Sequence, residues 1–336
     1  MSTRALRVGM VGYAFMGAAH AQGWRNAPRF FDLPVDIELT AVAGRNAVAV
    51  AAAAERFGFA SAETDWRTLV ERDDIDLIDI CTPGDSHAEI AIAALRAGKH
   101  VLCEKPLANS VAEAEEMTAV AAEAATRGAY AMCGFTYRRT PALAYARSLI
   151  EQGRLGTIRH IRGQYLQDWL HDEDAPMTWR LDKSRSGSGA LGDIGAHLID
   201  TTQWLTGQSI AGVSALLETF VASRPVSGER SGLGGIGSAD APRAAVTVDD
   251  AALFTARFDG GAVGDRDQSV SRIRVTGPSL TRLTCISAPK TPVDTSAPRS
   301  RSAATKLSTS GSLTGRGAAM FQEGRRPLAV SAYKVN

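Results

Sequence analysis

The sequence of 336 residues predicts an α/β protein whose first part is a doubly wound parallel sheet. Short apolar runs alternate with helix-like segments over the first 135 residues, and a glycine-rich turn separates the first run from the first helix. Two of the later helices end at a glycine. The composition, 45% hydrophobic and 22% charged, is that of a globular protein. We expect no membrane span, because no run reaches the roughly 18 uncharged apolar residues that a span needs.

The first strand is predicted over Arg7–Val11, followed by the turn GYAFMG at residues 12–17 and a helix over Ala18–Trp24. This layout is typical of the GxGxxG dinucleotide pattern, whose glycines allow a tight turn, an approach of backbone to pyrophosphate, and close helix packing. Ala14 occupies the middle position, where its methyl group narrows the approach to phosphate. An ordinary strand-to-helix turn is the alternative. The candidate cofactor residues of this turn are Gly12, Ala14, Phe15, Met16 and Gly17.

The alternation of strands and helices continues after this turn. Further strands are predicted over Ile37–Ala43, Leu77–Cys81, His100–Cys103 and Tyr130–Gly134. Helices are predicted between them over Asn46–Phe57, His87–Ala97 and Val111–Arg127. Ligands of such a sheet bind at the carboxyl ends of its strands, so the residues that follow each strand are the candidate site.

The residues after the second and third strands are candidates for cofactor binding. An acidic residue after the second strand favours NAD by accepting a hydrogen bond from the ribose 2′-hydroxyl, but this sequence has Gly-Arg-Asn at 44–46. Arg45 suits a 2′-phosphate, which slightly favours NADP over NAD; a solvated arginine at a helix start is the alternative. Thr82 and Pro83 follow the third strand near the predicted phosphates and nicotinamide, and His87 opens the next helix.

The fourth strand ends in Glu104-Lys105-Pro106, which places a lysine where a nicotinamide ring would lie. An ammonium group at this position can donate a hydrogen bond to a substrate oxygen. Glu104 and Lys105 are therefore added to the cofactor candidates, and Lys105 is a catalytic candidate. A surface lysine at a strand end is the alternative.

A second group of candidates lies in the glycine-rich segment at 187–200, where Asp193 and His197 are four residues apart. If this segment is helical, both side chains face the same way. A carboxylate beside an imidazole can move a proton, because the histidine takes an alcohol proton and the aspartate orients it. A structural hydrogen bond between the two is the alternative.

Five motifs occur in the order and at the spacing of a known family. They are GYAFMGAAH (12–20), CTPGDSH (81–87), EKP (104–106), GFTYRR (134–139) and GALGDIGAH (189–197). Residues 7–264 resemble the glucose-fructose oxidoreductase / inositol dehydrogenase / MocA (Gfo/Idh/MocA) oxidoreductases. The segments TYRRTPAL (136–143), QYLQDW (164–169) and WR (179–180) are most similar to the levoglucosan dehydrogenase and inositol dehydrogenase branch.

This resemblance implies an N-terminal Rossmann domain over residues 1–135 and an α/β domain over 136–264. The second domain is expected to hold an open, mostly antiparallel sheet that in the family often forms the oligomer interface. The implied reaction is reversible hydride transfer between a secondary alcohol of a sugar or cyclitol and C4 of a nicotinamide. Lys105, Asp193 and His197 match the family's catalytic residues: His197 as general base, Lys105 stabilising the alkoxide, and Asp193 holding the geometry.

Substrate contacts are expected from polar and aromatic side chains, because a polyol needs several donors and acceptors beside an apolar ring face. A packing role is the alternative for each of them. The candidates are Tyr137, Gln167, Trp169 and Arg180.

Charge divides the chain into two parts. Residues 1–264 contain 25 Lys and Arg against 32 Asp and Glu, whereas residues 265–336 contain 12 against 4, together with 19 Ser or Thr. The resemblance also stops at Gly264. We therefore expect an incomplete, truncated second domain, and a basic segment over 265–336 that is disordered or read from a shifted frame. Such a terminus disfavours the dimer or tetramer that the resemblance implies.

The cysteines and the basic segment restrict the remaining function classes. Four scattered cysteines without a CxxC pair predict neither a disulfide framework nor a metal site, and favour a cytoplasmic compartment. Nucleic-acid binding is disfavoured, because the basic segment lacks interleaved aromatic residues. The expected partner is a small sugar or polyol, with no nucleic acid and no membrane. Alternatives are a non-catalytic dinucleotide- or sugar-binding regulator on the same fold, or an inactive truncated product.

Overall fold

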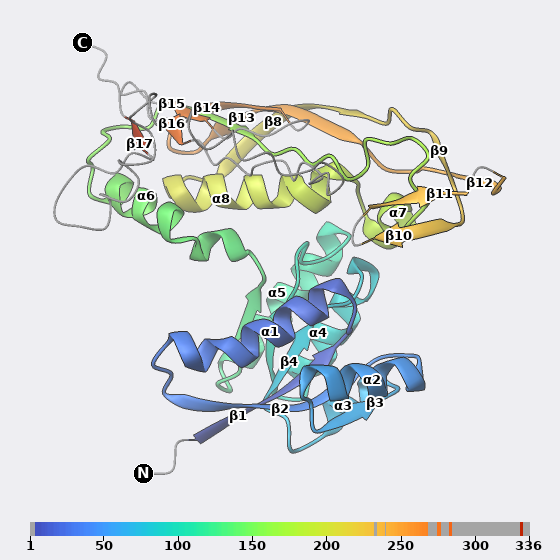
Figure 1. The fold of residues 1–336 in the computed structure, drawn as a ribbon. Coiled ribbons are helices and arrows are strands. Elements are labelled where there is room, and N and C mark those ends of the chain that lie inside the picture. The colour runs from blue at the N-terminus through green and yellow to red at the C-terminus, as the bar shows by residue number, and fades with distance from the viewer. Residues whose placement is uncertain are drawn as a thin grey trace, which may run out of the picture. The chain divides into compact units, whose positions relative to one another are not determined.

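The computed structural model describes residues 4–231, 234–238, 240–267, 274–276, 282–283 and 330–331. The chain forms two compact units, each made of several stretches of sequence (Figure 1). Unit 1 comprises Met1–Thr136, Asp168–His197 and Leu217–Ala252. Unit 2 comprises Tyr137–Gln167, Leu198–Leu216 and Leu253–Asn336.

Unit 1 is built on a six-stranded parallel sheet in the order β3-β2-β1-β4-β5-β6. Its strands are β1 (Arg4–Val11), β2 (Val35–Ala43), β3 (Ser61–Glu63), β4 (Leu77–Ile80), β5 (His100–Cys103) and β6 (Ala131–Cys133). The order reverses between β1 and β4, which is the switch point at which doubly wound sheets bind ligands. The predicted α/β fold of this part is confirmed.

Helices pack on both faces of this sheet (Figure 1). They are α1 (Phe15–Phe30), α2 (Ala47–Phe57), α3 (Trp66–Glu71), α4 (His87–Arg96) and α5 (Val111–Ala125), with a short 3₁₀ turn η1 (Gly84–Ser86) before α4. Met10 and Val42 pack with Val50 of α2 on one side, whereas Ile78 packs with Ile90 of α4 on the other. The central strands are thus apolar on both faces, because helices cover each face.

The later segments of unit 1 carry small elements. These are the 3₁₀ turn η3 (Trp179–Leu181), the short helix α7 (Lys183–Ser186), the π-helical turn η4 (Leu191–Gly195), and the strands β9 (Ser223–Pro225), β10 (Gly228–Ser231), β11 (Gly234–Gly237) and β12 (Arg243–Ala245). The strands form two antiparallel pairs, β9 with β12 and β10 with β11.

Unit 2 contains a five-stranded mixed sheet in the order β15-β7-β14-β13-β8. Its strands are β7 (His160–Gln164), β8 (Ile210–Glu218), β13 (Ala251–Phe258), β14 (Val263–Asp267) and β15 (Arg274–Thr276). The pairs β13–β14 and β15–β7 are antiparallel, whereas β14–β7 is parallel. A predicted second α/β part with its own sheet is thereby confirmed.

Two helices, α6 (Pro141–Glu151) and α8 (Ala196–Thr206), lie on one face of this sheet (Figure 1). Leu143 of α6 packs against Leu205 of α8. A Cβ placed on Gly163 of β7 would lie 2.8 Å from the Leu198 side chain, so this glycine brings α8 close to the sheet. A 3₁₀ turn, η2 (Thr136–Arg139), precedes α6.

The strand β14 continues to Asp267, past Gly264, and β15 pairs with β7 beyond it. Two strands of two residues each, β16 (Arg282–Leu283) and β17 (Val330–Ser331), pair in the antiparallel direction. Most of the segment over 265–336, which the sequence predicts to be disordered or frame-shifted, lies outside the described residues. Within the part of the chain that the structure describes, none of the helices combines the length and apolar character needed to cross a bilayer.

Candidate active site

The glycine turn lies at the switch point of the unit 1 sheet. Gly12 has φ +97°, and its N–H donates to the Ala43 carbonyl at 3.0 Å. A Cβ on Gly12 would come within 2.8 Å of the Cys81 carbonyl oxygen, and one on Gly17 within 2.2 Å of the Gly12 oxygen. Both positions therefore require glycine, the first between the ends of three strands and the second where α1 meets β1.

The start of α1 offers free N–H groups to an anion. Ala14 is the N-cap residue and makes no side-chain capping bond, and no acidic residue lies in the first turn. Phe15 is 58% exposed, whereas Met16 packs against the core. Uncapped N–H groups and the helix dipole suit a phosphate, so these residues fit the pyrophosphate of a dinucleotide.

The end of β2 carries no side-chain carboxylate. Arg45 is exposed there, and the next residue, Asn46, caps α2 by accepting the Ala49 N–H at 3.0 Å. The Tyr13 ring lies against Gly44, where a Cβ would come within 2.1 Å of it. Arg45 is thus the charged group that the structure leaves beside the predicted ribose position.

The loop after β4 is tied to the loop after β5. Thr82 accepts a hydrogen bond from the Ser86 hydroxyl at 2.8 Å. His87 is 1% exposed, and its ring nitrogens lie 2.9 Å from the Thr82 carbonyl oxygen and 2.8 Å from that of Pro106. Its contacts are therefore with the backbone of both loops, and Pro83 lies half-buried in the first of them.

The lysine after β5 reaches the predicted aspartate. The Nζ of Lys105 donates to the Asp193 Oδ1 at 2.8 Å and to the Asp193 carbonyl at 2.7 Å. The Nε of Arg180 lies 3.8 Å from the Asp193 Oδ2, and its guanidinium stacks on the Trp179 ring at 4.5 Å. The structure thus brings three of the predicted residues, Lys105, Asp193 and Arg180, into one charged group.

Asp193 lies in the π-helical turn η4, which Asp249 holds in place. The Asp249 carboxylate accepts the N–H groups of Gly189 at 2.8 Å and Leu191 at 2.7 Å. A Cβ on Gly189 would come within 1.9 Å of the Asp249 carbonyl oxygen. Sequence reasoning did not find Asp249, because it lies far along the chain and belongs to no motif. Single π-helical turns often occur at functional sites.

His197 lies in the first turn of α8, after this π-helical turn. Its ring meets the Phe135 ring edge to face, with centroids 6.3 Å apart. The sequence predicts Asp193 and His197 as neighbours four residues apart on one α-helix. The structure instead divides them between η4 and α8, because the π-helical turn interrupts the α-helical spacing.

A buried group beneath this site was not predicted as functional. The Nδ1 of His20 donates to Asp79 at 2.9 Å, and its Nε2 donates to the Glu104 Oε1 at 3.0 Å. Trp24, one turn further along α1, donates to Asp79 at 2.7 Å. Burial lowers the pKa of His20, but the hydrogen bonds to Asp79 and Glu104 outweigh it and raise this pKa to about 12.

The pKa values of Glu104 and Cys81, which both lie next to His20, shift in opposite directions. Burial raises the pKa of Glu104, but the hydrogen bond from His20 outweighs this effect and holds the pKa below its usual value. Burial raises the pKa of the Cys81 thiol to about 12. Ligand atoms of His20, Asp79 and Cys81 lie within 4.8 Å of one another, but both nitrogens of the imidazole are engaged by carboxylates. The group is therefore an ion-pair network.

Unit 2 holds a separate polar group. The hydroxyls of Tyr137 and Tyr165 lie 2.7 Å apart, and the Gln167 amide donates to the Tyr165 hydroxyl at 3.0 Å. The neighbouring Arg138 forms an ion pair with Asp200, its Nε 2.9 Å from the carboxylate. The structure thus joins two predicted substrate residues through Tyr165, which sequence reasoning missed although it lies in the quoted segment 164–169.

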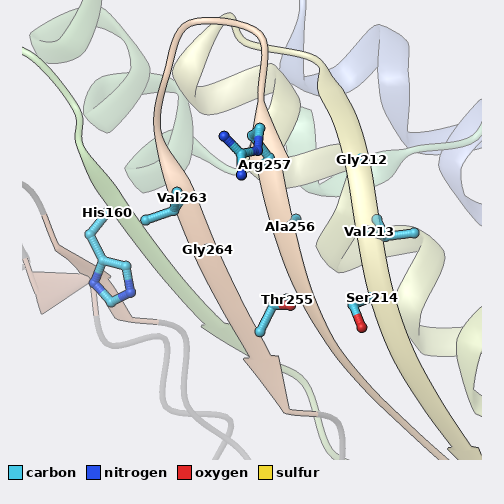
Figure 2. Close-up of a pocket in the computed structure, with 9 residues that line it drawn as sticks. All are labelled: His160, Gly212, Val213, Ser214, Thr255, Ala256, Arg257, Val263 and Gly264. Atoms are coloured by element: carbon cyan, nitrogen blue, oxygen red, sulfur yellow. The ribbon is translucent and has the colours of Figure 1, made fainter.

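The remaining predicted residue, Trp169, is half-buried in unit 1. A shallow hollow of about 550 Å³ lies on the exposed face of the unit 2 sheet, across β7, β14, β13 and β8 (Figure 2). Its polar side chains include His160, Arg257, Thr255 and Ser214. None of the predicted site residues lines this hollow.

The parallel sheet with its reversal of order, the glycine turn and the uncapped α1 define a dinucleotide-binding Rossmann domain. Residues 6–132 match a family model described as oxidoreductase family, NAD-binding Rossmann fold, and residues 143–279 match the GFO/IDH/MocA C-terminal domain. The chain belongs to the GFO/IDH/MocA oxidoreductase family. The second match runs to residue 279, so the expectation that the resemblance stops at Gly264 is wrong by about fifteen residues.

Several relatives are similar over most of the chain. Levoglucosan dehydrogenase of Pseudarthrobacter phenanthrenivorans is 44% identical over 264 residues, which are 77% of this chain and 66% of that protein. The chain thus matches less than two thirds of the length of this relative.

Two solved structures are similar in fold as well as in sequence. An oxidoreductase domain protein from Kribbella flavida is 56% identical, with a TM-score of 0.76 and coverage of 86% of this chain and 79% of that chain. A levoglucosan dehydrogenase in complex with NADH and levoglucosan is 38% identical, with a TM-score of 0.75 and coverage of 84% and 74%.

Proposed function

We propose that this protein is an NAD(P)-dependent oxidoreductase that transfers a hydride between a secondary alcohol of a sugar or cyclitol and a nicotinamide. The observation that carries the proposal is the Lys105–Asp193 pair, which stands just past the carboxyl end of β5 in the sheet that bears the glycine turn. Gly12, Gly17 and the uncapped start of α1 would hold the dinucleotide, which supplies the hydride acceptor at C4.

Each polar residue then has a distinct task. The Lys105 ammonium donates to the substrate hydroxyl oxygen and stabilises the negative charge that develops on it as the C–H bond breaks. Asp193 accepts from the same ammonium at 2.8 Å and so fixes its direction. His197 takes the hydroxyl proton on its imidazole as general base.

Polyol recognition is assigned mainly to neutral side chains, with Arg180 as the one charged donor. The hydroxyls of Tyr137 and Tyr165 with the Gln167 amide supply donors and acceptors of the kind that sugars bind. Trp169 and Arg180 supply an apolar face and a further donor. The names of the relatives, levoglucosan dehydrogenase above all, support an anhydrosugar or a related cyclic polyol as substrate.

For the cofactor, we infer that NADP is accepted at least as well as NAD. Arg45 is exposed after β2, and the loop at 44–46 has no carboxylate to bind a 2′-hydroxyl. The similar levoglucosan dehydrogenase structure contains NADH, so the inference depends on this chain's own arginine. Arg45→Asp is expected to shift the ratio of kcat/KM values at least tenfold toward NAD; an unchanged ratio would contradict the role of Arg45.

The test is a turnover assay on the full chain with NAD⁺ and NADP⁺ and a panel of levoglucosan, myo-inositol and glucose, following the absorbance of the reduced cofactor. Lys105→Met is expected to lower kcat by about 10²-fold or more while cofactor binding is retained. Lys183→Met, at an exposed position of α7, is the matched control and should keep wild-type turnover. Tight cofactor binding without turnover of any substrate would favour a regulator instead.

A further inference from the structure

The backbone at Lys105 is fixed by the side chain of the preceding residue, Glu104. The Glu104 Oε2 accepts the Lys105 backbone N–H at 3.0 Å, and its other oxygen accepts from the His20 Nε2 at 3.0 Å. A Cβ on Gly134 would lie 3.0 Å from this second oxygen, so the absence of a side chain there leaves Glu104 its space. Glu104 thus connects the backbone of Lys105 to His20.

The opposite edge of the His20 ring is fixed by a carboxylate with no exposure to solvent. Asp79 is 0% exposed and Glu104 is 5% exposed. Each ring nitrogen of His20 faces one of these carboxylates, and a carboxylate only accepts, so both nitrogens carry hydrogen. The ring is therefore an imidazolium that compensates two buried negative groups. Removing such a charge leaves its partners uncompensated.

The helix α1 connects His20 to the glycine turn of the predicted cofactor site. His20 lies in the first turns of the helix that starts at the glycine turn, so the helix that would hold the pyrophosphate also carries the imidazolium. On the other side of the Lys105 segment, His87 connects the Pro106 carbonyl to the Thr82 carbonyl of the loop after β4. One buried histidine, His87, and one partly buried histidine, His20, thus link the Lys105 segment to both cofactor loops.

We propose that His20 is a positioning residue for Lys105: its imidazolium, anchored on Asp79, fixes Glu104, and Glu104 fixes the backbone from which the Lys105 ammonium reaches Asp193. The inference rests on the proposed function of Lys105. Because small displacements of a catalytic group cost large factors in rate, His20→Gln is expected to lower kcat by about tenfold or more, with a smaller effect on KM for the cofactor.

A double-mutant cycle tests whether His20 acts through Lys105. The turnover of His20→Gln, Lys105→Met and the double variant is compared with that of the wild type. If the effect passes through Lys105, the double variant should match Lys105→Met within about twofold, because coupled residues are not additive. A further tenfold loss in the double variant would show an independent structural effect and overturn the proposal. His100→Gln, at the other end of β5, is the control and should keep wild-type kcat.

A second readout does not depend on turnover. The full-length variants are treated briefly with acetic anhydride, and the labelling of each lysine is measured by mass spectrometry. Lys105 is expected to be labelled several-fold faster in His20→Gln than in the wild type or in His100→Gln, because the ammonium leaves Asp193 more often. An unchanged labelling rate overturns the proposal.

Failure of the proposed function can be distinguished from failure of the proposed role of His20. A wild-type chain that reduces neither cofactor with any sugar or polyol sinks the proposed function, whereas the labelling still decides the role of His20. Should His20→Gln fail to fold, as judged by circular dichroism, Glu104→Gln replaces it, because this variant keeps the side-chain shape and removes the charge that His20 binds. It is expected to give the same faster labelling of Lys105, and wild-type labelling would overturn the proposal.

Discussion

The imidazolium of His20 gives the stability of the protein a defined dependence on pH. The perturbation is His20→Gln, which removes the titrating ring and keeps a neutral side-chain amide that can donate a hydrogen bond. In the folded protein, burial lowers the pKa of His20, but hydrogen bonds to Asp79 and Glu104 raise it to about 12, against 6.5 for an ordinary histidine. The folded state therefore holds a proton that the unfolded chain releases above neutral pH.

The sign and size of the effect follow from this difference. A raised pKa contributes stability that is complete below pH 6.5 and is lost as the pH rises toward 12. The free energy of unfolding falls by at most about 1.4 kcal/mol per pH unit for one proton. Between pH 7 and pH 9 the loss amounts to about 2.5 kcal/mol. No such loss is expected from His20 in the variant.

The assay is urea unfolding of the wild type and His20→Gln at pH 7, 8 and 9, followed by circular dichroism. Other groups that titrate in this range contribute to both proteins, so only the difference between the two slopes reports His20. The wild type should lose about 2.5 kcal/mol more than the variant. His100→Gln should retain the wild-type slope. Parallel slopes for wild type and His20→Gln would refute a charged His20 in the folded state.

Three further variants test the glycine turn, the π-helical turn and a buried arginine. Gly17→Ala places a Cβ 2.2 Å from the Gly12 oxygen, so cofactor affinity measured by calorimetry should fall at least tenfold; wild-type affinity would contradict this. Asp249→Asn removes an acceptor for Leu191, so kcat should fall about tenfold while cofactor affinity stays within twofold, and a fall in affinity alone would count against the role of Asp249. Arg224→Met removes a fully buried guanidinium that donates to three backbone carbonyl oxygens, so urea unfolding should show a loss of about 1–3 kcal/mol; an unchanged midpoint would disprove the contribution of Arg224.

The sequence predicts most of the unit 1 sheet, because its central strands are buried on both faces and read as short apolar runs. This pattern predicts strands over Leu77–Cys81 and His100–Cys103, and the structure has them at Leu77–Ile80 and His100–Cys103. The strand β3 was not predicted, because Ser61–Glu63 contains no apolar run and forms a strand only through its pairing with β2. The helix α3 was missed because its six residues are too few to show a helical period.

The site was predictable where its position follows from topology. Lys105 lies at a strand end, and the carboxyl ends of parallel strands lie on the ligand side of the sheet. The sequence gives less indication of a role for His20, which is only a histidine three positions after the last glycine of the turn. Its meaning depends on partners 59 and 84 residues away, which no local pattern places beside it. Asp249 was missed for the same reason, since its contacts with Gly189 and Leu191 span 60 and 58 residues.

The burial of Asp79 and Glu104 is itself an argument for a functional role of this network. Asp79 occupies a position in the central strand β4 between buried residues of the core. Buried ion pairs are weak sources of stability, because desolvation of the charges offsets most of their attraction. Stability alone therefore does not account for a buried carboxylate in a central strand. Asp79 instead contacts His20, His20 contacts Glu104, and Glu104 accepts the Lys105 backbone N–H. The buried carboxylate is therefore explained by a role in positioning the Lys105 ammonium that reaches Asp193.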